Sequence, residues 1–337
     1  MVNLNGQNRV AVKRYLITGA NGFVGKNLCA FVRFKNHQLT LFSREKVGQL
    51  GERTYVGNIE DALDPEVMLG VHAVFHLAGV AHLPIGNSSE ERDYYQKVNV
   101  DGTRSILELA IQSGVKRFVY FSSVKAGGEI QNNCLNEDSS CLPADVYGQS
   151  KLDAEHCVLE LGARAGIHVC ILRPALVYGA GMKGNLYQML QSIDGGRFPP
   201  LPAIPNRRSM ISVSDLIHAA WLVMHDERAN GKVYIAEDGE QYSSRRIYLA
   251  MLNALGRRPP AFNLPTNFFQ WLARFGDFLN RVGVNQPLFD SDHYLRLFGS
   301  VYYSADKIKN ELGWRPEQTF EDALPEIISW YKTSKNK

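Results

Sequence analysis

Short apolar runs alternate with longer amphipathic stretches through the first half of the chain. Helical periodicity is found at residues 23–34, 91–113 and 147–165. The runs around these stretches have the length and the β-branched or aromatic content of buried strands: Tyr15–Thr18, Leu39–Ser43, Ala73–Leu77, Phe118–Ser122 and Val169–Leu172. Strands that alternate with helices build parallel sheets through right-handed crossovers. The pattern therefore predicts an α/β fold, a doubly wound parallel sheet.

The pattern changes after Pro174. Glycine and proline are frequent from Gly179 to Pro205, which indicates loops with short helices. Residues 232–236 again have the pattern of a strand, and we expect them to return to the main sheet. We predict a first domain at residues 1–175 and a smaller, interleaved C-terminal lobe at residues 176–337. An apolar helical stretch at 264–284 either packs inside this lobe or contacts a membrane surface or a partner.

Composition and charge exclude several classes of protein. The 337 residues include 37 Lys and Arg against 34 Asp and Glu, a net charge of +3 that is spread along the chain and predicts no nucleic-acid partner. The hydrophobic share of 45% is that of a globular protein. No apolar run reaches the roughly 18 residues of a membrane span. The first twelve residues lack the apolar core of a signal peptide, so we expect a cytoplasmic protein.

The cysteines predict neither a metal site nor a disulfide framework. The spacing of the five fits neither C-x-x-C nor a zinc-ligand pattern: Cys29, Cys134, Cys141, Cys157 and Cys170. We expect free thiols in a reducing compartment. Cys134 and Cys141 share one polar loop and are the pair for which a disulfide is worth checking.

A glycine-rich turn joins the first predicted strand to the first predicted helix. Glycine permits positive φ and lets a pyrophosphate approach the backbone, and the helix N-terminus offers free N–H groups to the phosphates. The spacing is G-x-x-G-x-x-G, and a tight structural turn is the alternative. The position between a strand and a helix favours a dinucleotide site of Rossmann type. Its residues would be Gly19, Asn21, Gly22, Phe23, Val24 and Gly25.

The end of the second strand bears on the choice of cofactor. A carboxylate there would bind the 2′-hydroxyl of NAD, whereas an arginine accommodates the 2′-phosphate of NADP. This strand ends in Ser43 and Arg44, with Glu45 at the expected start of a loop. Arg44, assisted by Ser43, therefore favours NADP(H). The alternative is that Arg44 is a solvated surface residue.

Tyr147 and Lys151 form the candidate centre for proton transfer. They are four residues apart on a predicted helix, so both lie on one face. A free phenol titrates near pH ~10, and a neighbouring ammonium together with an oxidised nicotinamide would favour the phenolate. Ser122 and Ser123 follow the Phe118–Phe121 strand, at the sheet edge where parallel α/β folds bind ligands. A hydroxyl there could orient a substrate oxygen.

Together these motifs resemble the extended short-chain dehydrogenases/reductases, in the branch of nucleotide-sugar 4-epimerases, 4,6-dehydratases and 4-reductases. The resemblance covers almost the whole chain and includes His76–Gly79, Asn99–Thr103 and Leu172–Pro174. It implies a catalytic triad of Ser123, Tyr147 and Lys151. It also adds to the cofactor site Asn58, where the family more often has Asp, with Ile59, Leu77, Ala78, Gly79, Tyr147, Lys151 and Pro174.

The same resemblance implies how the C-terminal lobe holds a UDP-sugar. Arg208 matches the arginine that meets the diphosphate, Asn185 the asparagine at the nucleotide end, and Arg296 a looser phosphate ligand. Ser123, Lys125 and His82 would line the sugar pocket.

Two departures from the family pattern narrow the predicted activity. Dehydratases carry an Asp-Glu pair where this chain has Val124 and Lys125, which disfavours 4,6-dehydration. Arg44 favours a reductase that consumes NADPH. We therefore predict NADP(H)-dependent reduction of the C4 ketone of a UDP-linked (6-deoxy)hexose or hexosamine for surface polysaccharides. The alternatives are a UDP-hexose or UDP-N-acetylhexosamine 4-epimerase with NAD(H), and a non-catalytic NADP(H)-sensing protein.

The resemblance also implies a homodimer. Family members pair through the helix that follows Asn99 and the helix that carries Tyr147. Residues 106–111 are broadly apolar, so one face could pack on the sheet and another on a two-fold partner. A single wide core face is the alternative.

Overall fold

Seven strands form the central sheet in the computed structural model, which describes residues 11–81, 89–129, 132–282 and 289–335. Their order is β10-β7-β5-β4-β1-β2-β3, and the pairs from β7 to β3 are parallel. The strands are β1 (Arg14–Thr18), β2 (Gln38–Ser43), β3 (Arg53–Val56), β4 (Ala73–His76), β5 (Arg117–Phe121), β7 (His168–Pro174) and β10 (Lys232–Ala236). The predicted fold class is confirmed.

The chain divides into two units, and each is built from separate segments of the sequence. Unit 1 comprises Met1–Gly128, Ser140–Arg173 and Ile217–Tyr234. Unit 2 comprises Glu129–Ser139, Pro174–Leu216 and Ile235–Lys337.

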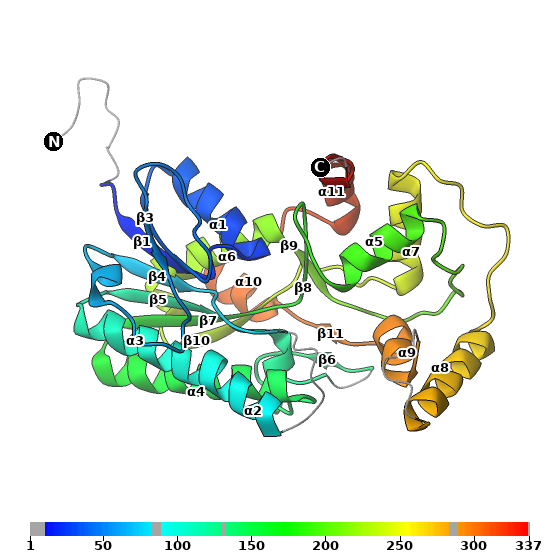
Figure 1. Ribbon diagram of the computed structural model, residues 1–337, viewed down its shortest axis with the longest axis horizontal. Helices are drawn as coiled ribbons and strands as arrows, with labels where there is room; N and C mark the ends of the chain where they lie inside the picture. The colour runs from blue at the N-terminus through cyan, green and yellow to red at the C-terminus, as the bar shows by residue number, and fades with distance from the viewer. Residues whose placement is uncertain (1–10, 82–88, 130–131, 283–288, 336–337) are drawn as a thin grey trace. The chain divides into compact units, whose positions relative to one another are not determined.

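Helices cover both faces of the unit 1 sheet (Figure 1). On one face lie α3 (Gly102–Gln112) and α4 (Val146–Ala165), and on the other lie α1 (Phe23–Phe34) and the part of α6 (Val213–His225) that belongs to this unit. The core under α3 and α4 contains fully buried side chains from the sheet and from both helices, among them Leu16, Val74, Phe118, Ile106, Leu107 and Val158. Because both faces are covered, the central strands are continuously apolar.

The helix predicted at 91–113 is interrupted in the structure. It consists of α2 (Ser89–Tyr95), the π-helical turn η2 (Gln96–Asp101) and α3. In the turn, Asn99 forms a two-way bond with the Val80 backbone: its Oδ1 accepts from the Val80 N–H at 2.8 Å, and its Nδ2 donates to the Val80 carbonyl at 3.0 Å. A wider turn of this kind is frequent at functional sites.

Unit 2 contains two small sheets and most of the remaining helices. The sheets pair β8 (Leu176–Tyr178) with β9 (Met210–Ser212) and β6 (Cys134–Leu135) with β11 (Tyr302–Tyr303). The longer helices are α5 (Asn185–Asp194), α7 (Ser244–Ala254), α8 (Thr266–Arg281), α9 (Ser291–Phe298), α10 (Asp306–Leu312) and α11 (Phe320–Lys335). Unit 1 also contains short 3-10 turns at η1 (Pro65–Met68), η3 (Val124–Ala126) and η4 (Glu227–Ala229).

The five cysteines are free thiols, Cys134 and Cys141 included. Within the described ranges, no three His, Cys, Asp or Glu side chains are arranged to hold a metal ion. The helices placed by the structure are all too short or too polar to cross a membrane.

Candidate active site

The glycine turn after β1 is packed too closely for larger residues. Gly19 has φ of +68°, and a Cβ there would lie 2.9 Å from the Ala78 nitrogen. A Cβ on Gly25 in α1 would overlap the Gly19 carbonyl oxygen. The helix therefore begins directly against the turn, with a glycine as its N-cap and no side chain bonded to its first N–H groups. This cradle fits the pyrophosphate of a dinucleotide.

The carboxyl ends of β1 and β4 are tied together by buried hydrogen bonds. Thr18 Oγ1 accepts from the backbone N–H groups of Leu77 and Ala78, each at 3.1 Å. The imidazole of His76 bonds Thr18 Oγ1 at 2.7 Å and Thr103 Oγ1 at 2.9 Å. These bonds fix the Leu77–Gly79 segment beside the glycine turn, where the sequence predicts cofactor contacts.

We expect His76 to make the protein less stable in mild acid. Burial lowers the pKa of His76 from 6.5 to about 3, so the unfolded chain binds a proton that the folded chain excludes. The stability that this histidine contributes is complete above pH 6.5 and is lost progressively as the pH falls toward 3. The free energy of unfolding should decrease by about 2 kcal/mol between about pH 7 and pH 5.

Urea unfolding at several pH values measures this effect. His76→Asn should make the dependence on pH shallower, whereas His156→Asn, at an exposed position on α4, should leave it unchanged. An unaltered slope in His76→Asn would contradict the assignment.

Asn99 connects the cofactor edge of the sheet to α4. Its Nδ2 donates to Ser150 Oγ at 2.9 Å, and Ser150 Oγ donates to the Tyr147 carbonyl at 2.8 Å. A Cβ on Gly79 would lie 3.0 Å from Asn99 Oδ1 and 4.0 Å from Lys151 Nζ. A side chain at position 79 would therefore crowd the Asn99 amide. Asn99 was not among the predicted site residues. A single amide side chain between two valines was the pattern that could have identified it.

The end of β2 holds a carboxylate as well as an arginine. Glu45 accepts a hydrogen bond from Asn21 of the glycine turn, with 2.7 Å between Asn21 Nδ2 and Glu45 Oε2. Ser43 is buried and donates to the Glu45 carbonyl at 2.5 Å, whereas Arg44 is exposed. The residue interpreted as the start of a loop therefore reaches back to the dinucleotide turn.

Two more of the predicted cofactor residues, Asn58 and Ile59, lie after β3. Ile59 is buried, and Asn58 donates to Asp61 at 2.9 Å. Pro174, the last predicted cofactor residue, ends β7.

Ser123 and Tyr147 are brought together by the loop after β5 and the first turn of α4. The Ser123 hydroxyl next to Tyr147 lowers the pKa of Tyr147, but burial is the larger effect and raises that pKa to about 12. Asp145 caps α4 by accepting from the Gly148 N–H at 2.7 Å, and its other oxygen pairs with Lys125 Nζ at 2.6 Å. Lys125 thus orients the start of the catalytic helix.

Lys151 is buried with its ammonium aimed at the end of β5. Its Nζ donates to the Phe121 carbonyl at 2.7 Å and lies 4.2 Å from the centre of the Tyr120 ring. Burial lowers the pKa of Lys151 to about 7, and the Glu155 carboxylate acts in the opposite direction. The protein alone therefore leaves the Tyr147 pKa high, and a cationic nicotinamide would provide the further stabilisation of the phenolate.

A buried ion pair behind Lys151 is missing from the predicted site. Glu155 and Arg173 are 1% and 4% exposed, and Arg173 Nη2 donates to Glu155 Oε2 at 2.6 Å and Nε to Oε1 at 2.9 Å. Ser122 Oγ also donates to Glu155. Glu155 follows Lys151 by one helical turn, so the spacing of Tyr147, Lys151 and Glu155 was the signal that could have identified it.

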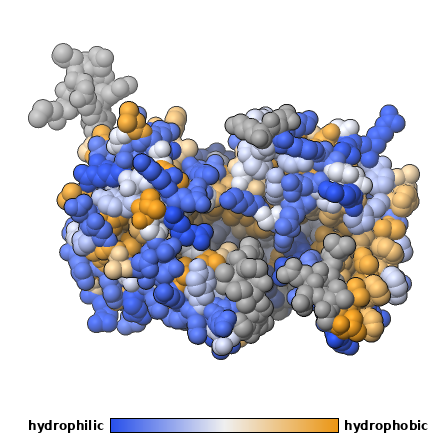
Figure 2. Space-filling view, viewed as in Figure 1, coloured by the Kyte–Doolittle hydropathy of each residue, from blue (hydrophilic) through white to orange (hydrophobic). Residues whose placement is uncertain are grey.

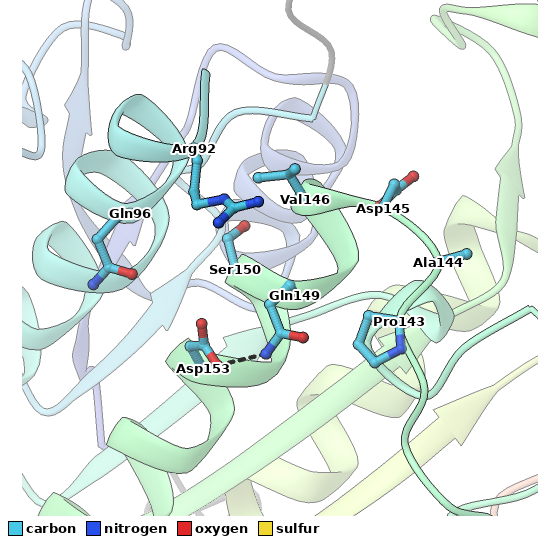
Figure 3. Close-up of a pocket in the computed structure, with 9 residues that line it drawn as sticks. All are labelled: Arg92, Gln96, Pro143, Ala144, Asp145, Val146, Gln149, Ser150 and Asp153. Atoms are coloured by element: carbon cyan, nitrogen blue, oxygen red, sulfur yellow. Dashed lines mark hydrogen bonds between the residues drawn. The ribbon is translucent and has the colours of Figure 1, made fainter. Parts of the chain in front are cut away.

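A polar hollow of about 530 Å³ lies beside the start of α4 (Figure 3). Arg92 and Gln96 line one side, and the other side is formed by Pro143, Ala144, Asp145, Val146, Gln149, Ser150 and Asp153. Because Ser123, Tyr147 and Lys151 are not part of its lining, we do not assign the reaction to this hollow.

In unit 2, Arg208 is the predicted substrate residue whose side chain is held by the surrounding protein. Its Nη2 donates to the Leu295 carbonyl at 3.1 Å, next to Arg296, which is exposed in the last turn of α9. Its Nε is buried without a partner, and burial lowers the pKa of the guanidinium. Asn185 is the exposed first residue of α5. His82 lies outside the described residues.

Comparisons with known proteins agree with this arrangement. Residues 15–236 match the NAD dependent epimerase/dehydratase family. A UDP-glucose 4-epimerase of Vibrio cholerae is 29% identical over 96% of this chain and 97% of its own length. A 3 beta-hydroxysteroid dehydrogenase/Delta 5→4-isomerase of Mycobacterium tuberculosis is 30% identical over 94% and 90%.

A solved structure extends the likeness to the fold. MoeE5 in complex with UDP-glucose and NAD superimposes with a TM-score of 0.75 at 23% identity and covers 96% of this chain and 99% of its own.

Proposed function

Since the chain belongs to the NAD dependent epimerase/dehydratase family, we propose that it is a 4-epimerase of UDP-linked hexoses that works with NAD(H). The serine–tyrosine–lysine group of unit 1 supports oxidoreduction at a hydroxyl-bearing carbon. The Vibrio cholerae relative supports C4 of a UDP-hexose as that carbon. Net reduction of a 4-keto sugar by NADPH is the second candidate, because Arg44 follows β2 directly.

Arg208 is the observation that carries the choice of substrate class. A buried guanidinium N–H without a partner is costly, and a diphosphate oxygen would satisfy it with a charge-assisted hydrogen bond. The apolar body of a sterol offers no such acceptor. The nucleotide-sugar relatives therefore fit this chain better than the hydroxysteroid dehydrogenase does.

Glu45 favours NAD over NADP. Its carboxylate is held at the end of β2 by Asn21, where it can accept from a ribose 2′-hydroxyl. This charge would repel a 2′-phosphate at the same place. The exposed guanidinium of Arg44, the preceding residue, would attract it. The cofactor preference therefore rests on the balance between these two neighbouring residues.

The reaction uses groups whose positions are fixed by the sheet and by α4. Tyr147 removes the proton from the sugar 4-hydroxyl and later returns one to the 4-keto oxygen, while Ser123 donates a hydrogen bond to the same oxygen. Lys151, one helical turn beyond Tyr147 and bonded to the Phe121 carbonyl, would favour the phenolate when its amine is protonated. A dinucleotide held by the glycine cradle and Glu45 would supply the hydride acceptor and donor for C4.

Dehydration is disfavoured by the residues after Ser123. Val124 is buried, and the ammonium of Lys125 is paired with the helix-capping Asp145. Neither residue can deliver a proton as a carboxylic acid would.

Cofactor content and cofactor-free turnover test the proposal. The purified protein should contain NAD and should interconvert UDP-glucose and UDP-galactose without added cofactor. Glu45→Gln should weaken NAD binding by about 10- to 100-fold, because a charge-assisted hydrogen bond is lost. Glu66→Gln, at an exposed position on η1, is the matched control and should bind NAD normally.

Other outcomes would select a different function. Consumption of NADPH in proportion to product, with NADPH binding lost in Arg44→Gln, would establish the reductase. If the protein turned over a 3β-hydroxysteroid and no UDP-sugar, its substrate would be a sterol and the proposed UDP-sugar class would be wrong.

We also propose a homodimer formed through α3 and α4. Ile106, Leu107 and Ala110 are buried on α3, whereas Leu109 and Ile111 pack against the same core with part of their surface exposed, and that part would contact the partner. A dimeric mass in sedimentation equilibrium at micromolar concentration would support this assembly.

A further inference from the structure

Helix α8 presents a continuous apolar surface to solvent. Spacings of three and four residues place four side chains of α8 on one face, and the C-cap residue Val282 continues the row. We call the five together the apolar stripe: Phe268, Trp271, Phe275, Phe278 and Val282. Each is between 40% and 62% exposed. Figure 2 shows apolar side chains gathered over this part of unit 2. Exposed aromatic side chains in such a row indicate a binding surface, because isolated exposed apolar residues are common but contiguous ones are not.

The opposite face of α8 is already packed, so the stripe is not an unfinished core. Phe269 and Ala273 are buried, and a Cβ on Gly276 would overlap the Phe289 carbonyl oxygen. Asp277 accepts two hydrogen bonds from Ser291 at the start of α9, from its N–H at 3.0 Å and its hydroxyl at 2.6 Å. The helix is therefore fixed in unit 2 with the stripe facing outward.

The polar border of the stripe is basic. Arg274 and Arg281 follow Trp271 and Phe278 by three positions each, so both guanidinium groups border the stripe on one side, and both residues are exposed. The acidic residue of the helix, Asp277, accepts from Ser291 of α9 and stays charged near Arg281, so two arginines face a single carboxylate along this side of α8. Apolar side chains flanked by arginines match the interface of an anionic bilayer, where aromatic rings enter the headgroup region and arginines meet phosphates.

A second copy of the chain matches this surface poorly. In an antiparallel two-fold pair of stripes, the arginine borders of the two helices would lie side by side. In a parallel pair, each arginine border would face Leu272 and Leu279, the partly exposed residues of the other border. Neither arrangement gives Arg274 or Arg281 an acidic partner, so charge complementarity favours an anionic surface.

We propose that α8 docks the protein on the surface of a bilayer that contains anionic phospholipid. The stripe lies in the interfacial plane without crossing the membrane, and Arg274 and Arg281 bind headgroup phosphates. This binding is independent of the proposed epimerase activity, because it involves none of the residues assigned to catalysis, cofactor or substrate.

Flotation of the full-length protein with vesicles tests the proposal. One set of vesicles contains phosphatidylcholine alone, and the other contains about 30% phosphatidylglycerol. The protein should float with the anionic vesicles, and Trp271 emission should shift to the blue, a change that is absent in Trp271→Phe. Trp271→Gln with Phe275→Gln should weaken binding by about 10- to 100-fold. Arg274→Gln with Arg281→Gln should weaken it by roughly 10- to 30-fold.

Matched variants separate the stripe from general surface effects. Phe34→Gln with Leu142→Gln removes two exposed apolar side chains of unit 1, and Arg164→Gln with Arg315→Gln removes two exposed arginines elsewhere. Both should bind vesicles as the wild type does, and turnover of soluble substrate should be unchanged in all these variants. Equal flotation with neutral vesicles, or no flotation, would overturn the proposal. So would a loss of dimer mass in the stripe variant, which would assign the stripe to a second copy.

Discussion

Tyr147→Phe should lower turnover by about 10²- to 10⁴-fold, the usual contribution of general acid–base catalysis. The substitution removes the phenolic hydroxyl next to Ser123 and keeps the half-buried ring in place. Cofactor affinity should be nearly unchanged, because the glycine cradle and Glu45 lie on other elements. Steady-state kinetics and a titration of the apoprotein with NAD measure the two quantities.

Tyr95 provides the control for this experiment. Its ring lies 6.0 Å from that of Tyr147 and is buried, whereas Tyr147 is half-buried. Tyr95→Phe should retain most of the activity if the loss depends on the Tyr147 proton and not on packing. Near-normal turnover in Tyr147→Phe would remove the tyrosine from the mechanism, and equal losses in both variants would indicate a structural effect.

Arg173→Met should decrease the free energy of unfolding by about 3–5 kcal/mol, because it leaves the Glu155 carboxylate charged and without its partner in the protein interior. Glu155→Met should decrease the free energy of unfolding by a similar amount, because it leaves the Arg173 guanidinium charged and without its partner. The double variant should recover much of the loss, since apolar residues of similar volume often replace a buried ion pair at little cost. Denaturant unfolding at neutral pH measures all three variants.

The surface pair between Arg164 and Glu160 is the appropriate comparison. Both side chains are mostly exposed, and their atoms are 3.5 Å apart. Removing one of them should cost less than about 1 kcal/mol. A loss of this size in Arg173→Met would show that water reaches the Glu155–Arg173 pair. A double variant no more stable than either single variant would mean that packing, and not charge, accounts for the cost.

The sequence predicted those features that depend on short-range spacing. Helix α1 begins and ends as expected, and the proximity of Tyr147 and Lys151 follows from four residues of helix. The glycine turn was recognisable because its three glycines stand between a strand and a helix. Each of these features is determined within one or two adjacent elements, where periodicity and backbone sterics are sufficient.

Features that require contact between distant segments were not predictable. Glu155 pairs with an arginine 18 residues away on β7, and Asn99 breaks a helix to bond the backbone of Val80. Glu45 lies in the loop after β2 as expected, but its bond to Asn21 spans 24 positions and was not predicted. The strand β3 was missed because its four residues are partly exposed and include Arg53 and Thr54, so they lack the apolar run of a buried strand.

The placement of β10 has a consequence for synthesis on the ribosome. This strand lies beside β7 but is encoded after about 60 residues that belong mainly to unit 2. Until Lys232–Ala236 emerges, the nascent chain exposes the edge of β7, and open strand edges can pair with other chains. Translation of the intervening segment therefore sets a period in which the sheet is vulnerable to aggregation. For the same reason, a gene fragment that stops at residue 175 would encode the glycine turn, Tyr147 and Lys151 but leave that edge permanently open.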